Sequence, residues 1–483
     1  MEYDPGRCFR LVDEVSEVVR LAEGVGSTGR LQPEPIRRAV EALRMFESFC
    51  RGTGVEQFIA VGTSAIREAA NQHEFWAALR AATPLDLQII SADEEAPLGY
   101  LGTVNALGLV DGFVFDTGGG STQVGAVHGR HLTHSFSVQA GVVRFTERYV
   151  KSDPISKDQL RRLRDGARAA FAGHSWLHAA PGLALAGMGG TVRTLARMDQ
   201  KQRAYPLDRV HGYTLSREAL AGLVDQLARR GRREREQLPG LKSDRADVTL
   251  AGAVIVEQLM DQGGFAELTV SGQGVREGIF YRHFLPDADP PLLDDPRGFS
   301  VRNLALLSFY EQAHCDKVAE IAHSLYDQLV PLHGYGPWER ELLGYAAMLH
   351  DIGVSVGYYD HHKHSEYLVH NATLLGFTHR EIAILGALVR NHRKGLVDLA
   401  PFAPVLAPDD GQRVARLSAL LRIAEYLERS KSQLVQSVRV ELGEDVRVLV
   451  RATGDADIEI WEAHRHASLF KKAFERDVAI LAA

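Results

Sequence analysis

The sequence has few cysteines, no long apolar run and no excess of positive charge. Its 483 residues contain three cysteines, at positions 8, 50 and 315, without a C-x-x-C pair. This pattern argues against a disulfide framework and against a zinc ribbon. No run of about 18 apolar residues occurs, and no basic and then apolar leader follows Met1, so we expect a cytoplasmic protein with no membrane partner. A formal net charge of −7 gives no general attraction to nucleic acid, and an anionic substrate has to be bound locally.

Composition and length indicate a globular protein with several cores. Hydrophobic residues make up 45% of the chain and charged residues 24%, which is ordinary for a globular protein. A chain of 483 residues exceeds what one core supports, so it should divide into three or four domains. A stretch rich in proline and aspartate at 287–296 (DADPPLLDDP) is typical of a linker.

The periodicity changes along the chain from α/β to helical and then to short strands. Before the linker, apolar strands alternate with helical spacing, as in an α/β domain. From about 301 to 431 the pattern is helical, and after it the alternation returns. The predicted elements are a helix at 34–50, strands at 57–62, 87–90, 112–115, 183–186 and 267–270, three tail strands at 438–442, 446–450 and 458–460, and a closing helix from about 464.

The segment VFDTGGGSTQ (114–123) has the composition of a phosphate-binding turn. Glycines let successive N–H groups converge on one oxygen, and a short hydroxyl side chain adds a donor. Asp116, at the end of the strand, can hold Mg²⁺ because hard cations take carboxylate oxygens. Two further glycine turns, at 187–191 and 271–274, also follow apolar strands, which indicates a crevice at the carboxyl ends of a sheet.

Three charged residues near this predicted crevice each have an ordinary interpretation and a functional one. Glu94 and Glu95 suit the first turn of a helix, where carboxylates are stabilised. A glutamate facing the crevice can instead orient water and accept its proton. Arg67 is either a surface residue or a guanidinium that binds a phosphoryl group.

Five segments together resemble the exopolyphosphatase / guanosine pentaphosphate phosphohydrolase family, in its order and at its spacing. The resemblance covers essentially the whole chain. The segments are TSAIREAAN (63–71), ISADEEAPLGYLG (90–102), FDTGGGSTQVG (115–125), AGMGGTVRTLA (186–196) and VSGQGVREGIFY (270–281).

The resemblance implies an α/β actin-like (ribonuclease-H-like) two-domain ATPase fold, followed by an all-α HD-like domain and a small α+β tail. The implied domains are 1–110, 111–288, 297–431 and 432–483. It further implies that Glu95 is the catalytic base and that Asp116 binds Mg²⁺ (or Mn²⁺). The implied phosphate-binding residues are Arg67, Gly118, Gly119, Gly120, Ser121, Thr122, Gly189, Gly190 and Thr191.

Three departures from the family pattern concern the site. Pro97 stands where the family usually has arginine, and Gln123 stands where it usually has glutamate and cannot bind metal as an anion. The family's first strand and first phosphate loop, Asp-x-Gly-(Ser/Thr)-Asn-Ser, do not precede the segment that opens this sequence. A natural truncation is one explanation. We favour a misplaced start, because loss of that strand would expose apolar surface and unpaired strand edges; an in-frame Asp-x-Gly motif upstream in the DNA would test it.

A second constellation of possible ligands lies in the helical part. AAMLHDIG (346–353) places His350 and Asp351 together, with His314 upstream and Glu425 on a later helix. The arrangement resembles the HD metal-dependent phosphohydrolases, with glutamate in place of the usual final aspartate. Imidazole and carboxylate groups together suit divalent metals. The ordinary interpretation is a degenerate module whose histidines are structural.

We therefore expect an exopolyphosphatase that releases phosphate from inorganic polyphosphate with Mg²⁺. Guanosine pentaphosphate 5'-phosphohydrolase is the alternative, because both substrates end in a phosphoanhydride. A non-catalytic regulator that binds polyphosphate or nucleotide is the second alternative, motivated by Pro97, Gln123 and the absent loop. The resemblance also implies a homodimer.

Overall fold

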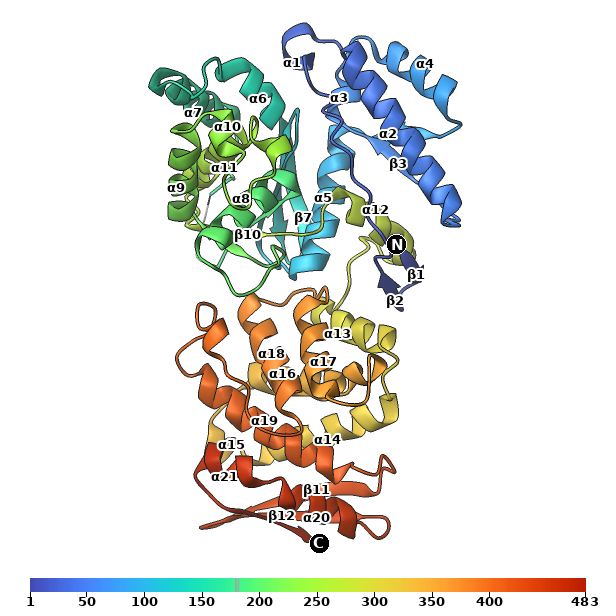
Figure 1. Cartoon of the computed structure of the whole chain (residues 1–483), viewed down its shortest axis with the longest axis vertical. Helices are drawn as coiled ribbons and strands as arrows, with labels where there is room; N and C mark the ends of the chain where they lie inside the picture. The colour runs from blue at the N-terminus through green and yellow to red at the C-terminus, as the bar shows by residue number, and fades with distance from the viewer. Residues whose placement is uncertain (179, 181) are drawn as a thin grey trace. The chain divides into compact units, whose positions relative to one another are not determined.

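The computed structural model describes residues 1–483 except 179 and 181, and it divides into two compact units (Figure 1). The N-terminal unit comprises Met1–Gly6 and Leu11–Asp294, and the C-terminal unit comprises Arg7–Arg10 and Asp295–Ala483. The short strands β1 (Glu2–Asp4) and β2 (Cys8–Arg10) open the chain. In the part of the chain that the structure describes, no helix combines the length and apolarity needed to cross a membrane.

The first part of the N-terminal unit packs two long helices beside a small parallel sheet. Helix α2 begins with a proline at its first position, where a missing N–H costs nothing, and buries Ile36 and Val40 on one face. The predicted strand at 57–62 is shorter in the structure and begins at Ala60. The elements are α1 (Val25–Thr28), α2 (Pro33–Gly52), β3 (Ala60–Gly62), α3 (Ser64–Arg67), α4 (Gln72–Ala82) and β4 (Leu87–Ile89), with β3 and β4 parallel.

The second part is built on a six-stranded mixed sheet in the order β7-β6-β5-β8-β10-β9. Strands β5, β6 and β7 form an antiparallel meander, and β8 and β10 add to β5 in parallel. This order is that of a ribonuclease-H-like sheet. The strands are β5 (Gly112–Thr117), β6 (Thr122–His128), β7 (His131–Val138), β8 (Ala184–Met188), β9 (Thr214–Ser216) and β10 (Glu267–Val270).

Alternate side chains of β5 supply the two faces of this sheet with core residues. Phe113 and Phe115 pack with the core of α7, α8, α9 and α11, whereas Val114 packs with Tyr100 and Val104 of α5 on the opposite face. Figure 1 shows the sheet between these two layers. The helices are α5 (Ala92–Leu107), α6 (Val142–Tyr149), α7 (Lys157–Phe171), α8 (Gly189–Gln202), α9 (Arg217–Ala228), α10 (Arg232–Arg235), α11 (Thr249–Gly263) and α12 (Val275–Phe284).

Helices α5 and α12 cross at a distance that only glycine permits. A Cβ atom on Gly278 would lie 1.9 Å from the carbonyl oxygen of Leu98, and one on Gly102 would lie 2.2 Å from that of Gly274. The two backbones are therefore in direct contact, and this contact fixes α5, the helix that carries Glu95.

The C-terminal unit is a helical bundle whose core continues into a three-stranded sheet. The core includes Leu325, Leu417 and Val448. The sheet order is β11-β12-β13. The elements are α13 (Pro296–Leu307), α14 (Gln312–Gln328), α15 (Val330–His333), α16 (Pro337–Leu349), α17 (His361–Asn371), α18 (His379–Asn391), α19 (Asp410–Leu427), β11 (Val435–Leu442), β12 (Val446–Ala452), α20 (Asp457–Arg465), α21 (Ser468–Phe474) and β13 (Val478–Ala482).

One prediction for the tail was wrong, and another was incomplete. The segment 458–460 lies in helix α20, where Glu459 and Ala463 face the interior one turn apart. Three residues of alternating polarity fit a strand or a helix equally well. The spacing of four residues between the buried Glu459 and Ala463 is that of a helix. The helix predicted from about 464 occurs as α21, but it does not close the chain, because strand β13 follows it and pairs parallel to β12.

Candidate active site

The first turn of helix α5 places two adjacent glutamates, Glu94 and Glu95, in different environments. Ser91 caps the helix: its hydroxyl accepts a hydrogen bond from the Glu94 N–H (3.2 Å), and the Glu94 carboxylate accepts one from the Ser91 N–H (2.7 Å). This capping box holds Glu94 at the surface. Glu95 lies about 100° further round the helix and is 9% exposed. The helix start therefore directs Glu95 into the interior.

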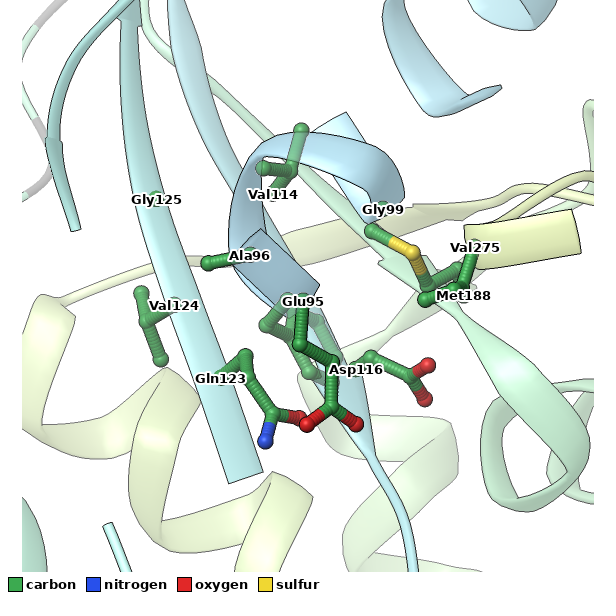
Figure 2. Close-up of a pocket in the computed structure, with 11 residues that line it drawn as sticks. Glu95, Ala96, Gly99, Val114, Asp116, Gln123, Val124, Gly125, Met188 and Val275 are labelled. Carbon is green, nitrogen blue, oxygen red and sulfur yellow. The ribbon is translucent and has the colours of Figure 1, made fainter. Parts of the chain in front are cut away.

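Glu95, Asp116 and Gln123 line one small pocket, together with apolar residues that include Val124 and Met188. Figure 2 shows the Glu95 carboxylate beside the Gln123 amide, with the Asp116 carboxylate nearby. The sheet register brings these groups together, because Asp116 on β5 lies opposite Gln123 on β6 and Met188 on β8. The predicted base and the predicted metal ligand thus share one pocket.

The Glu95 carboxylate is buried and holds one cationic partner. Burial raises its pKa, and a hydrogen bond from Arg67 opposes that rise. The Arg67 Nη1 atom lies 3.2 Å from Glu95 Oε2 and also donates to the carbonyl oxygen of Ile90 at 2.7 Å. A carboxylate with a raised pKa is a better proton acceptor than an ordinary one. Arg67, predicted to bind phosphate, here contacts the predicted base.

The Asp116 carboxylate suits a hard cation. Burial raises its pKa to about 6, and the charge of Arg193 opposes this rise. No described residue donates a hydrogen bond to it. Gly189, at φ +83°, leaves room for it, since a Cβ there would lie 2.2 Å from Asp116 Oδ1. A half-buried anionic oxygen without a donor among the described residues fits Mg²⁺ or Mn²⁺. Gln123 donates its amide N–H to Ser121 (2.8 Å) and keeps its carbonyl oxygen as a neutral acceptor.

The turn at 118–121 offers backbone donors. The carbonyl oxygens of Gly118 and Gly119 accept hydrogen bonds from the first N–H groups of α6, at 2.9 and 3.0 Å. No described residue accepts from the N–H groups of Gly119 and Gly120, so these two donors are available to an anion. The Thr122 hydroxyl differs from the prediction in having a structural partner, because it donates to the Ala140 carbonyl oxygen at 2.6 Å.

The first turn of α8, at the predicted glycine turn 189–191, contacts two arginines that were not predicted from the sequence. The Arg245 guanidinium lies where a Cβ of Gly190 would be, at 2.3 Å, and Arg193 Nε donates to the Gly189 carbonyl oxygen at 3.2 Å. Burial lowers the pKa of Arg245, and it forms no ion pair with a described residue. Arg193 lies in the quoted segment 186–196, whereas no local pattern marks Arg245, which comes 55 positions after Gly190.

The first glycine turn contacts the segment that carries Arg67. A Cβ on Gly120 would lie 2.9 Å from the Ser64 hydroxyl, and Arg144 pairs with Glu68 at 2.6 Å. The Thr191 hydroxyl donates to the Thr117 carbonyl oxygen at 3.1 Å and joins the second turn to β5. The segment that carries Arg67, strand β5 and the two glycine turns are therefore in contact with one another.

The four predicted ligands of the C-terminal unit also converge. Glu425 Oε2 lies 3.2 Å from His314 Nε2 and 3.0 Å from His350 Nε2. Asp351 Oδ2 lies 3.8 Å from His314 Nε2. Burial lowers the pKa of His350, but the two carboxylates outweigh it and raise that pKa to about 9. His361 and His392 also approach Asp351 Oδ1 with their Nε2 atoms, from α17 and from the end of α18.

A strand-end acid, a glycine turn with open donors and a buried glutamate on an actin-like sheet define an enzyme that acts on phosphoryl groups. The chain belongs to the Ppx/GppA phosphatase family: the family model matches residues 2–286, and that of Ppx/GppA phosphatase domain III matches residues 297–452. Enzymes of this family hydrolyse phosphoanhydride bonds, and the chain is a hydrolase of this class.

The chain is also similar to solved structures. An exopolyphosphatase-like protein is 26% identical, with a TM-score of 0.52, over 57% of this chain and 92% of that one; this likeness supports the actin-like ATPase-type fold. A Ppx/GppA family member from Aquifex aeolicus is 28% identical over 56% of this chain and 88% of that one (TM-score 0.47). An exopolyphosphatase from Cytophaga hutchinsonii is 24% identical over 55% and 86% (TM-score 0.49).

Proposed function

We propose that the chain is an exopolyphosphatase, which hydrolyses the terminal phosphoanhydride of inorganic polyphosphate and releases phosphate. The observation that supports it is the pairing, in one pocket, of a buried glutamate with an aspartate to which no residue in the described part of the chain donates a hydrogen bond. A divalent cation held by Asp116 would neutralise phosphate oxygens and orient the substrate.

Each remaining role follows from the contacts of the side chain or backbone concerned. The N–H groups of Gly119 and Gly120 and the Arg245 guanidinium would bind the terminal phosphoryl group. Glu95 accepts a proton from water while the water oxygen attacks phosphorus. The P–O bond to the shortened chain breaks, and the leaving phosphate oxygen carries the charge or takes a proton from solvent.

Two alternatives share this site. Guanosine pentaphosphate presents the same terminal phosphoanhydride, so the pocket serves it equally. A regulator that binds polyphosphate or nucleotide without turnover is favoured by the neutral Gln123 in the pocket and by the Arg67–Glu95 contact at 3.2 Å, which occupies the base. A homodimer and a cytoplasmic location, both expected from the sequence, belong to the proposal as well.

Phosphate release from both substrates with Mg²⁺, for wild type, Glu95→Gln and Glu94→Gln, separates these functions. We expect Glu95→Gln to lower kcat about 10²–10⁴-fold, the usual effect of losing a general base. Glu94→Gln is the matched control, because glutamine also completes a capping box. Equal rates for wild type and Glu95→Gln would remove Glu95 as base. Substrate binding without phosphate release by wild type would favour the regulator.

We further propose that the helical part of the C-terminal unit is HD-like and that His314, His350, Asp351 and Glu425 hold one divalent metal ion. Their donor atoms approach one another at 3.0–3.8 Å, and imidazole with carboxylate suits a transition metal. The proposed domain boundaries remain 1–110, 111–288, 297–431 and 432–483.

A further inference from the structure

Helix α20 of the C-terminal unit directs its large apolar side chains away from the core. Ile458 and Trp461 are 67% and 59% exposed, whereas Glu459 between them is 3% exposed. The helix packs against α19 and β13, and its buried residues are Glu459 and Ala463. Figure 1 shows α20 close to the C-terminus, at one end of the unit. A surface helix normally buries its apolar stripe and exposes its acids, so the outer side of α20 has the character of a contact surface.

Five exposed residues make up this outer side, which we call the α20 face: Asp457, Ile458, Trp461, His464 and Arg465. Their spacings of three and four positions place them on one side of the helix. Single exposed apolar residues are ordinary on a protein surface, but here the two apolar residues lie within one stripe that charged residues close at both ends. Tryptophan and arginine are also enriched among the residues that dominate binding at protein interfaces.

The α20 face is self-complementary about Trp461. Asp457 and Arg465 lie four positions before and after Trp461, and Ile458 and His464 lie three positions before and after it. Two copies of the helix in antiparallel contact at Trp461 therefore place Asp457 of each copy opposite Arg465 of the other, about 6 Å along the axis from the centre. The antiparallel arrangement also brings opposite ends of the two helix dipoles together.

The two charged residues at the ends of the face are available for such a contact. Arg465 is 61% exposed and contacts its own helix, with its guanidinium 5.2 Å from the centre of the Trp461 ring and 3.6 Å from a carboxylate oxygen of Glu462. Within the described part of the chain, Asp457 forms no ion pair. A guanidinium that already lies over Trp461 can accept a carboxylate from a second copy without leaving the ring.

We propose that the α20 face is the centre of a two-fold interface between two copies of this chain. Trp461 lies at the axis and packs on Trp461 of the second copy, and Asp457 of each copy pairs with Arg465 of the other. A two-fold contact of this kind uses the same patch on both subunits. The inference rests on the homodimer that forms part of the proposed function, and it names the surface that holds the dimer together.

The oligomeric state of the full-length protein, measured by sedimentation velocity over a concentration series, tests the interface. We expect wild type to dimerise and Trp461→Ala to raise the dissociation constant about 30-fold or more, as for the loss of a central interface residue. Tyr359→Ala is the matched control, because Tyr359 is an aromatic residue of the same unit that is 89% exposed and lies outside α20. We expect this control to dimerise like wild type.

An exchange of charges tests the antiparallel register. Asp457→Arg places two arginines opposite each other at both ends of the helix pair, so we expect monomers. The double variant Asp457→Arg/Arg465→Asp restores an opposite-charge pair at both ends, so we expect dimers again. Circular dichroism checks that each variant is folded, which we expect because the substituted side chains are exposed and outside the core.

The outcomes separate the interface from the homodimer itself. Wild type that stays monomeric at every concentration would overturn both. Dimers that persist in Trp461→Ala and in Asp457→Arg would overturn the interface and leave the homodimer. A folded double variant that stays monomeric would overturn the antiparallel register. Phosphate release is measured separately, so a failure of the proposed hydrolase activity remains distinguishable from a failure of the interface.

Discussion

Glu94 and Glu95 have identical chemistry and adjacent positions, yet only one of them reaches the pocket. Glu94 completes the cap on Ser91, so its carboxylate stays at the surface. The sequence alone allows a capping role for either residue, and position within the family motif selected Glu95. The structure adds the physical reason, since one step along a helix turns a side chain by about 100°.

At the same scale, burial raises the pKa of Glu95 and Arg67 limits that rise. Arg67→Gln removes the hydrogen bond that opposes the raised pKa of Glu95, so this pKa should rise further. A base must be ionised, and the acidic limb of the kcat/KM profile should therefore move to higher pH in the variant. The measurement is phosphate release across pH 4–9 at low substrate concentration. If the acidic limb of the variant lies at the same pH as that of wild type, Arg67 does not influence the pKa of the catalytic base.

Arg245 should contribute to substrate binding, because its guanidinium lies on Gly190 without an ion-pair partner among the described residues. We expect Arg245→Ala to raise KM about 10–100-fold, as for a lost hydrogen bond to a charged group worth about 1.5–3 kcal/mol. Arg229→Ala is the control, since that side chain is 80% exposed and, among the described residues, forms an ion pair with Asp225 alone, four positions before it. Steady-state kinetics on polyphosphate measure both; a KM shared with the control would refute the assignment.

At the scale of elements, the α5–α12 contact should limit what α5 tolerates. Gly278→Ala places a methyl group 1.9 Å from the Leu98 carbonyl oxygen, and overpacking of this kind costs about 1–3 kcal/mol. We expect a lower urea midpoint together with reduced kcat, because α5 carries Glu95.

The matched control for this prediction is Gly222→Ala in helix α9, where a Cβ meets no atom within 4 Å. Alanine is the better helix former, so this variant should be as stable as wild type or more so. A urea midpoint for Gly278→Ala equal to that of Gly222→Ala would contradict the prediction, because it would show that the α5–α12 contact accommodates the added methyl group.

Elements that end at a glycine turn were predictable from sequence, and elements defined by distant contacts were not. The strands at 112–115 and 267–270 occur as β5 and β10 because a β-rich apolar run followed by glycines leaves little choice. The segment 458–460 was too short to set its own period. The contact of Arg245 with Gly190 could not be predicted, because no motif near residue 245 indicates it and only the folded chain brings the two residues together.

At the scale of the whole molecule, the C-terminal unit depends on a buried acid that joins two helices. Asp410 is fully buried and accepts hydrogen bonds from Arg380 at 2.8 and 2.7 Å and from the Ala407 N–H at 2.7 Å. Burial raises the pKa of Asp410, but these hydrogen bonds outweigh it and the pKa is lowered overall. Asp410→Asn should therefore lower the free energy of unfolding by about 1–3 kcal/mol at neutral pH.

The difference in stability between wild type and Asp410→Asn should shrink as the pH falls. A lowered carboxyl pKa stabilises the folded state above the unfolded value of about 4, and the effect is lost as pH falls through the lower folded value. Thermal unfolding at pH 7 and pH 3 should show wild type and Asp410→Asn converging in acid. If the difference in unfolding temperature between the two proteins stays constant or widens at pH 3, the charge of Asp410 is not the cause of the difference.

The convergence of His314, His350, Asp351 and Glu425 in the folded chain has a consequence for how the proposed metal site would be loaded. The Nδ1 atom of His350 lies 2.6 Å from the Ala347 carbonyl oxygen, and its Nε2 atom lies 3.0 Å from Glu425 Oε2, so these side chains are in place without an ion. Chelation would then empty the proposed site without melting the helices, unlike a zinc finger, whose folding waits for its ion. Occupancy would be a matter of supply and exchange, so the same folded chain would exist in differently charged forms as the surrounding metal pool changes.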